Sequence, residues 1–98
     1  MADDRKAGNR KLIITKQFKK DYQRCFKRGW QIDLLDDVIS RILAGEKLDN
    51  KHHEHLLGGK YSNDMECHIK FDWVLTYEIF GEFLILKRTG THQDVFDD

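Results

Sequence analysis

Several features that define other protein classes are missing from this sequence of 98 residues. It contains no proline, no internal repeat and no low-complexity tract, and its two cysteines, Cys25 and Cys67, have no CxxC spacing. This excludes a disulfide framework, and the default is a reduced, cytoplasmic protein. No apolar run approaches the ~20 residues of a membrane span, and the first four residues do not form a signal peptide. We therefore expect a cytoplasmic protein with no membrane partner.

The chain also lacks a net charge, because 17 basic residues balance 17 acidic ones. Neutrality argues against tight binding to naked nucleic acid. The charges are nevertheless unevenly placed: residues 10–28 hold eight basic side chains and one acidic one, a balance of +7. This segment is either a phosphate-binding surface or a solvated helix face, and charge alone does not separate the two. Under the first interpretation, Lys16, Lys19 and Lys20 are the candidates for contacting nucleic-acid phosphates.

Familiar catalytic signatures are absent as well: no glycine-rich phosphate loop, no Ser/His/Asp ordering and no paired glutamates. The chain has five histidines instead. Histidine exchanges a proton near neutral pH, since its ordinary pKa is about 6.5. Two imidazoles flanking a phosphodiester can remove the proton of a ribose 2′-hydroxyl and return one to the leaving 5′-oxygen. A guanidinium can stabilise the charge on phosphorus. Such chemistry needs no metal and acts only on RNA.

The order of patterns predicts one small α+β domain over residues 10–98, preceded by a flexible tail over residues 1–9. A short strand over 11–15 leads through a Thr15 N-cap to a helix over 16–28, and a second helix follows over 32–44. Residues 46–61 are predicted to be a polar connection. Three strands follow, and the apolar run 83–86 suits a strand covered on both faces. We expect a small, mainly antiparallel sheet with a helical hairpin packed on one side, and the first strand at an edge or beside the last.

The β-hairpin around residues 66–79 carries the main candidate site. Its polar and apolar residues alternate on both sides of Phe71-Asp72, which predicts two strands and a tight turn. Glu66 and His68 should share an open face of the first strand. Asp72 and Trp73 then lie at the turn, so a base, a carboxylate and a flat ring gather within a few residues.

Each of these residues also has a plainer interpretation. A single strand histidine such as His68 is usually structural, Asp72 is typical of a turn, and Trp73 and Phe96 are typical of a core. The histidines at 52, 53 and 55 with Cys67 and His68 have no standard zinc spacing, so a metal site is not predicted. The individual signals are weak.

The ordered combination is more specific. It consists of His55-Leu56-Leu57-x-Gly59, Cys67-His68-Ile69-x-x-Asp72-Trp73-Val74-Leu75-x-Tyr77, and Leu84-x-Leu86-x-Arg88-Thr89-Gly90-Thr91-His92-x-x-x-Phe96. These motifs resemble the RelE/ParE superfamily of bacterial type II toxins, and within it the YafQ-like branch of mRNA interferases. With the order of helices and strands, the resemblance extends over residues 11–96.

The resemblance implies a toxin that enters the ribosomal decoding site, cuts mRNA there without a cofactor, and is held off by a cognate antitoxin. The positions that match the family's catalytic cluster are His55, His68, Asp72 and His92. Those expected to bind the substrate are Trp73, Arg88 and Phe96, and the expected contacts to rRNA are Lys16, Lys19 and Lys20.

The resemblance also implies a role for each group. His92 would be the general acid, Asp72 or His68 would help remove the 2′-proton, and His55 would orient the phosphate whose charge Arg88 stabilises.

Two other functions remain open from the sequence. A ParE-like protein would poison DNA gyrase by binding, without nuclease chemistry, although ParE-type members generally lack the histidine cluster. A catalytically dead RNA-binding module is the third possibility.

Overall fold

The computed structural model describes residues 10–61 and 63–96, so the tail predicted over 1–9 lies outside the described residues. The elements are β1 (Lys11–Ile14), α2 (Lys16–Lys27), α3 (Ile32–Leu43), a 3-10 turn η1 (Asn50–His52), β2 (His55–Leu56), a second turn η2 (Gly59–Tyr61), β3 (Met65–Lys70), β4 (Trp73–Phe80), β5 (Phe83–Gly90) and α4 (His92–Phe96).

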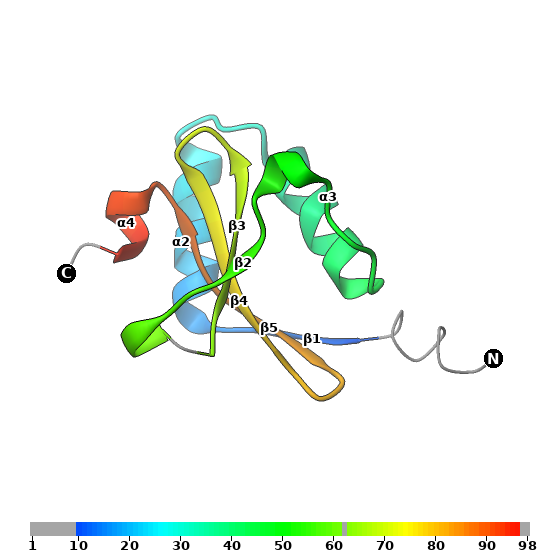
Figure 1. Cartoon of the computed structure of the whole chain (residues 1–98). Helices are drawn as coiled ribbons and strands as arrows, with labels where there is room; N and C mark the ends of the chain where they lie inside the picture. Colours follow the sequence, from blue (N-terminus) through cyan, green and yellow to red (C-terminus); the bar gives the residue numbers. More distant parts are fainter. Residues whose placement is uncertain (1–9, 62, 97–98) are drawn as a thin grey trace.

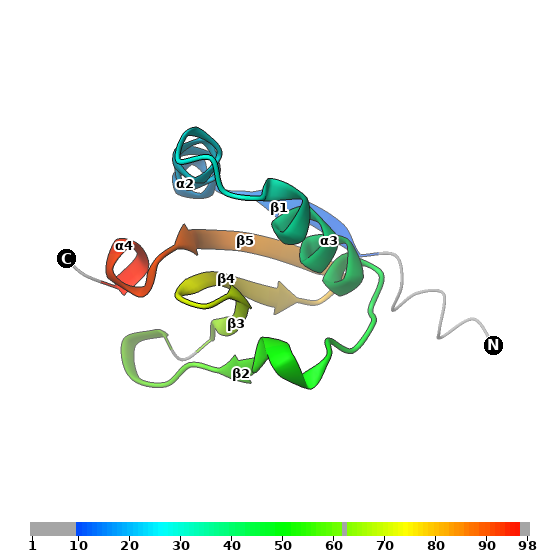
Figure 2. The same ribbon diagram turned by 90° about the horizontal axis from the view of Figure 1, so that it is seen from above.

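The strands form one five-stranded sheet in the order β1-β5-β4-β3-β2 (Figure 1). Only the β1–β5 pair is parallel within the described residues, and the other three pairs are antiparallel. The prediction of an α+β domain with a mainly antiparallel sheet is therefore confirmed. β1 lies both at an edge and beside the last strand. Seen from above, the strands follow one another in this order and α4 lies beyond the end of β5 (Figure 2).

Helices α2 and α3 cover one face of the sheet because their apolar residues recur at helical spacing. The Thr15 hydroxyl accepts a hydrogen bond from the Phe18 backbone N–H (3.1 Å), so the predicted N-cap is confirmed. The buried cluster that joins the helices to the sheet contains Phe18, Cys25, Leu35, Val38, Ile42, Leu48, Cys67, Ile69, Trp73, Leu75, Tyr77, Leu84 and Leu86.

A buried carboxylate fastens α2 to the end of β5. Asp21 is fully buried and accepts hydrogen bonds from the Arg88 Nε (2.7 Å) and the Thr89 backbone N–H (3.1 Å). Arg24 donates a third at 2.9 Å. A buried charge is tolerated only when it is paired and hydrogen-bonded in this way. Asp21 thus fixes where β5 ends, and hence where the chain enters α4.

Three features differ from the sequence prediction. The connection over 46–61 contains β2, which is too short to show a periodicity and forms only because β3 offers a free edge. Residues 92–96 form α4, which was not predicted. The run 83–86 is not covered on both faces: Leu84 and Leu86 are buried, whereas Phe83 and Ile85 are only half-buried, since α2 and α3 pack on one side.

The start of α4 depends on a capping box. The Asp94 carboxylate accepts from the Thr91 backbone N–H (2.9 Å), and the Thr91 hydroxyl accepts from the Asp94 N–H (3.0 Å). Gly90 precedes this box with φ +147°, and a Cβ there would lie 2.7 Å from the Asp94 Oδ2. Glycine is therefore required for the chain to turn so sharply from β5 into α4.

Candidate active site

The site lies on the sheet face opposite α2 and α3. The strand registers pair His55 with Glu66, Glu66 with Thr76, and Thr76 with Arg88. Directly paired residues project from the same face, so these four form one row across β2, β3, β4 and β5. His68 lies two residues from Glu66 and shares this face, as the alternation predicts.

Asp72 and His92 are brought together although they are 20 residues apart. The Asp72 Oδ1 accepts hydrogen bonds from the His92 backbone N–H (3.0 Å) and from its Nδ1 (2.8 Å). These bonds, the backbone one first, hold the pKa of Asp72 below its usual value. Because a carboxylate only accepts, the Nδ1 of His92 carries a hydrogen, and its Nε2 is the nitrogen left for chemistry.

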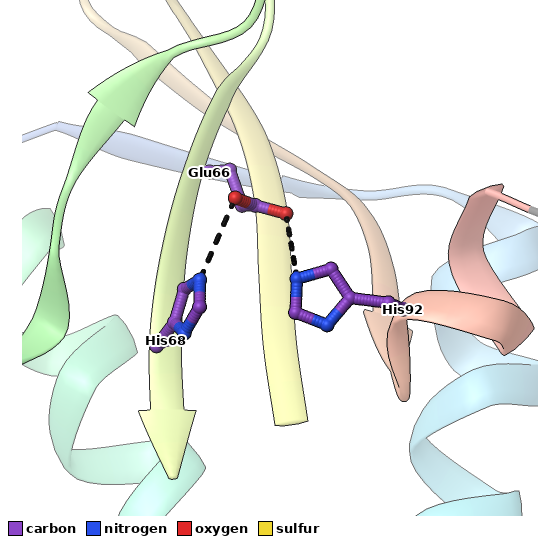
Figure 3. A group of neighbouring side chains, drawn as sticks. All are labelled: Glu66, His68 and His92. Carbon is purple, nitrogen blue, oxygen red and sulfur yellow. Dashed lines mark ion pairs between the residues drawn. The ribbon is translucent and has the colours of Figure 1, made fainter. Parts of the chain in front are cut away.

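Glu66 is the carboxylate at the centre of the site, and it is only 4% exposed. Its Oε1 lies 3.7 Å from the His68 Nε2, and its Oε2 lies 3.8 Å from the His92 Nε2. Figure 3 shows both imidazoles, one from β3 and one from the start of α4, pointing toward this carboxylate. The two rings meet edge to face with centroids 5.2 Å apart.

His55 completes the group from β2. Its Nε2 lies 3.1 Å from the Glu66 Oε1, and its Nδ1 lies 2.7 Å from the His53 carbonyl oxygen. That carbonyl accepts from Nδ1 and so fixes the ring. The neighbouring His52 is buried and bonded to the His68 carbonyl through its Nδ1 (2.7 Å), so it supports β3.

Aromatic side chains border the cluster. The Phe96 ring lies 6.2 Å from that of His92 and packs edge to face on Tyr61 (5.4 Å). Phe71, at the β3–β4 turn beside Asp72, is 99% exposed. Phe71 and its neighbour Lys70 line two surface hollows of about 530 and 560 Å³. These volumes are within the range of small-molecule sites.

The structure therefore gathers all four predicted catalytic residues, His55, His68, Asp72 and His92, and places Phe96 beside them. The other two predicted substrate-binding residues, Trp73 and Arg88, are held by contacts within the fold. Trp73 is only 4% exposed, donates its Nε1 hydrogen to the Thr89 hydroxyl (3.0 Å) and packs against the Trp30 ring at an angle of 57°. Arg88 is paired with the buried Asp21 and also donates to the Asp94 carbonyl of α4 (3.0 Å).

Glu66 is the residue that sequence reasoning missed as a site member. Its signal was its position two residues before His68, which placed it on the same face. The zinc combination considered from the sequence does not assemble, because Cys67 is fully buried on the core face. Instead, Glu66, His68 and His92 offer ligand atoms that all lie within 4.8 Å of one another.

The two thiols take no part in this cluster. Cys25 and Cys67 are both free and buried, and burial raises the pKa of Cys25 to about 11. Burial raises the pKa of Cys67 as well, so both remain protonated near neutral pH. The groups that can exchange protons here are imidazoles and carboxylates.

The three predicted rRNA-binding lysines are exposed on α2. One of them, Lys20, lines a further hollow of about 400 Å³ together with Arg24, Lys27 and Arg28. Arg28 forms an ion pair with Asp94 (2.7 Å), which links this basic side of α2 to α4.

The fold and the cluster of imidazoles and carboxylates together define a RelE-like toxin domain. The family model described as "Bacterial toxin of type II toxin-antitoxin system, YafQ" matches residues 10–97. A curated relative, the mRNA interferase toxin YafQ of Escherichia coli, is 26% identical over 88 residues, which are 89% of this chain and 96% of the relative. This chain belongs to the YafQ family of type II toxins.

Solved structures agree with this membership. The E. coli DinJ–YafQ toxin–antitoxin complex contains a chain 26% identical, with a TM-score of 0.84 over 90% of this chain and 98% of that one. A copper-bound mutant toxin from Helicobacter pylori is 37% identical, with a TM-score of 0.84 over 88% of this chain and 98% of that one. Among the residues that the structure describes, no helix is long and apolar enough to cross a membrane.

Proposed function

We propose that this toxin is an endoribonuclease that cuts mRNA on the cytoplasmic ribosome by attack of a ribose 2′-hydroxyl, without a metal ion in the reaction. The observation that carries this proposal is the geometry around His92: its Nδ1 is fixed by Asp72, and its Nε2 is turned toward His68 and Glu66. The endoribonuclease class is supported by the curated relatives, both named mRNA interferase toxins.

His92 is the general acid in this proposal. Its Nε2 donates a proton to the 5′-oxygen as the bond from phosphorus to that oxygen breaks. Asp72 stays ionised, because its pKa is lowered, and therefore orients the ring and stabilises its charged form. This gives Asp72 a positioning role and leaves proton removal to another group.

His68 is the general base. Its Nε2 takes the proton of the 2′-hydroxyl while the 2′-oxygen forms the new bond to phosphorus. The products are a 2′,3′-cyclic phosphate, which can open to a 3′-phosphate, and a 5′-hydroxyl. Glu66 lies between the imidazoles and keeps them facing the same small space.

The remaining groups bind the substrate. His55 at the rim of the row contacts the phosphate. Arg88 supplies positive charge within the same row, although part of its hydrogen-bonding capacity is used by Asp21. Phe71 and Phe96 offer exposed ring faces or edges for nucleobases, and stacking of a base on an aromatic ring contributes about 1–3 kcal/mol.

The partner that restrains the toxin is a cognate antitoxin protein. The support is the E. coli complex in which a similar chain is bound to DinJ. The ribosome supplies the mRNA in an extended form. The phosphates of the ribosomal RNA are the ligand for the basic side of α2.

The test is single-turnover cleavage of a short mRNA on purified ribosomes, compared with the same mRNA carrying a 2′-O-methyl group at the scissile nucleotide. We expect cleavage of the unmodified message, with a 5′-hydroxyl product, and none of the methylated one. Ribosomes require Mg²⁺ themselves, so the methyl block is more informative than omission of metal. A gyrase poison or an inactive binding module cuts neither message. A hydrolase that uses metal-bound water cuts both and leaves a 5′-phosphate, and either result overturns the proposal.

A further inference from the structure

We propose that the hollow between α3 and the end of β3 holds one nucleotide of the mRNA, the one that carries the attacking 2′-hydroxyl, and that Asp49 selects a base with an exocyclic amino group there. This inference deepens the proposed function and rests on its assignment of His68 as base and His92 as acid. The hollow and its preference among bases can nevertheless be tested with RNA that cannot be cut.

The hollow has the size and the lining of a nucleotide site. Its volume is about 530 Å³, which lies within the range of small-molecule sites. Val38 of α3 and Ile69 of β3 are buried and give it an apolar floor. Phe71, which is almost wholly exposed, is another of its lining residues. A flat base can therefore leave water for an apolar surface and pack against an aromatic ring.

The position of His68 decides which nucleotide enters. His68 and His92 approach the Glu66 carboxylate from β3 and from the start of α4 (Figure 3), and of these two histidines only His68 lines the hollow. The helices α3 and α4 lie on opposite sides of the β3–β4 hairpin (Figure 1).

A general base must lie beside the ribose whose 2′-hydroxyl attacks, and a general acid beside the nucleotide that leaves. The nucleotide on the 5′ side of the scissile phosphate therefore lies against His68, with its base in the hollow. The nucleotide on the 3′ side lies toward α4. This gives the mRNA one direction across the sheet.

Positive side chains around the hollow suit the phosphates of this nucleotide. Lys51 and Lys70 both line it. Neither lysine forms an ion pair with another residue in the part of the chain that the structure describes, so their ammonium groups are available to RNA. Clustered ammonium groups bind backbone phosphates whatever the base sequence. These two lysines therefore contribute affinity, and the choice of base depends on other groups.

Asp49 is the group that can choose the base. Two carboxylates line the hollow, and Asp37 accepts a hydrogen bond from the Arg41 Nε (2.9 Å). Asp49 is exposed at the N-cap of η1, and its side chain makes no capping hydrogen bond. A carboxylate only accepts hydrogen bonds, so it favours a base edge that carries an amino group. Cytosine has such a group where uracil has a carbonyl oxygen, which a carboxylate repels.

The first measurement is NMR titration of the ¹⁵N-labelled toxin with two dinucleotides. Their 5′ nucleotide is 2′-deoxycytidine or 2′-deoxyuridine and their 3′ nucleotide is uridine, so neither contains the 2′-hydroxyl that would attack. We expect both to shift the backbone amide signals of Ile69 and Phe71. The deoxycytidine form should bind about tenfold more tightly, as expected for one hydrogen bond to a charged acceptor. Equal affinities would overturn the selectivity, and shifts confined to other faces would overturn the pocket.

Variants separate the roles of the lining residues. Asp49→Ala should reduce the tenfold preference to less than about twofold. Glu46→Ala is the matched control and should keep the preference, because Glu46 also acts on the charge of Arg41 but does not line the hollow. Lys70→Gln should weaken both dinucleotides alike, by roughly twofold to fivefold. Circular dichroism verifies that each variant is folded. A folded Asp49→Ala protein with an undiminished preference would overturn the role of Asp49.

The second measurement is cleavage on ribosomes programmed with messages that carry cytidine or uridine on the 5′ side of the scissile bond, and then on its 3′ side. Asp49→Ala should lower kcat/KM about tenfold for cytidine on the 5′ side and have little effect on the choice at the 3′ side. A loss that follows the 3′ nucleotide instead would overturn the assigned direction of the mRNA. If the parent toxin cuts no message, the proposed function fails, whereas the NMR titration still decides whether the hollow binds a nucleotide.

Discussion

At the scale of single residues, Asp72 shows how one turn position acquires a role. It has φ +54°, which is uncommon outside glycine and is best tolerated by Asn and Asp. A turn residue was the plainer interpretation of Asp72, and the structure confirms it. The same position also places the carboxylate against His92, so the structural and functional interpretations apply together.

We predict that Asp72→Asn reduces single-turnover cleavage about tenfold, and that Asp72→Ala reduces it by up to the 10²–10⁴-fold that a general acid contributes. Asparagine keeps an acceptor for the His92 N–H groups and the backbone conformation, but removes the charge. Alanine removes both. If folded Asp72→Ala cleaves at the parent's rate, catalysis does not depend on the hydrogen bonds from His92 to Asp72.

Phe71 offers a second prediction at this scale. Phe71→Ala should raise the KM for ribosome-bound mRNA about tenfold, as expected for the loss of one stacked base, with little change in kcat. The control is Phe80→Ala, since Phe80 is 66% exposed at the end of β4 away from this turn. Equal effects of the two substitutions would mean that Phe71 has no specific contact with the substrate.

At the scale of elements, α4 is held by charge as well as by its capping box. The Arg28 guanidinium, and then the Thr91 backbone N–H, hold the pKa of Asp94 well below its usual range. A carboxyl whose pKa is lowered by folding stabilises the protein above its unfolded pKa of about 4. That contribution is lost as the pH falls from there toward the folded pKa.

Asp94→Asn should therefore lower the free energy of unfolding by about 1 kcal/mol at pH 7, a modest value because the pair is partly exposed. The difference from the parent should shrink between pH 4 and pH 2. Urea unfolding at these pH values measures it. Asp37→Asn, which breaks the more exposed ion pair with Arg41, is the control and should cost less at every pH. A loss that stays constant down to pH 2 would show that charge plays no part.

At the scale of the whole molecule, neutrality conceals an asymmetric surface. Four of the eight basic side chains in residues 10–28 have internal partners: Arg10 donates to the Ile42 carbonyl, Lys11 pairs with Glu82, Arg24 pairs with Asp21, and Arg28 pairs with Asp94. The exposed lysines of α2 are what this segment can present to a ribosome.

Replacement of Lys16, Lys19 and Lys20 together by glutamine should weaken ribosome co-sedimentation. The plot of log affinity against log salt should become shallower, its negative slope decreasing in magnitude by roughly two. This is expected for the loss of three contacts to RNA phosphates. Lys11→Gln is the control, because Lys11 lies on β1 beside the start of β5, at the end of that strand far from α4, and pairs there with Glu82. Co-sedimentation that is unchanged across the salt series would exclude this face.

Much of the fold followed from the sequence, because periodicity and capping depend on neighbours along the chain. The helices, the hairpin turn at Phe71-Asp72 and the shared face of Glu66 and His68 are of this kind. The Thr91-x-x-Asp94 capping box was equally local, and α4 was missed because five residues show no period.

The tertiary structure decided what depended on strand order and register. Only the pairing of β3 with β2 brings His55 to Glu66, and only the turn at Gly90 brings His92 to Asp72. The burial of Trp73 and the pairing of Arg88 with Asp21 likewise join residues far apart in the chain. Local pattern placed His68 on its strand and Asp72 at its turn. Long-range packing brought His55 and His92 to them around Glu66, since distance along the chain carries no information about distance across a sheet.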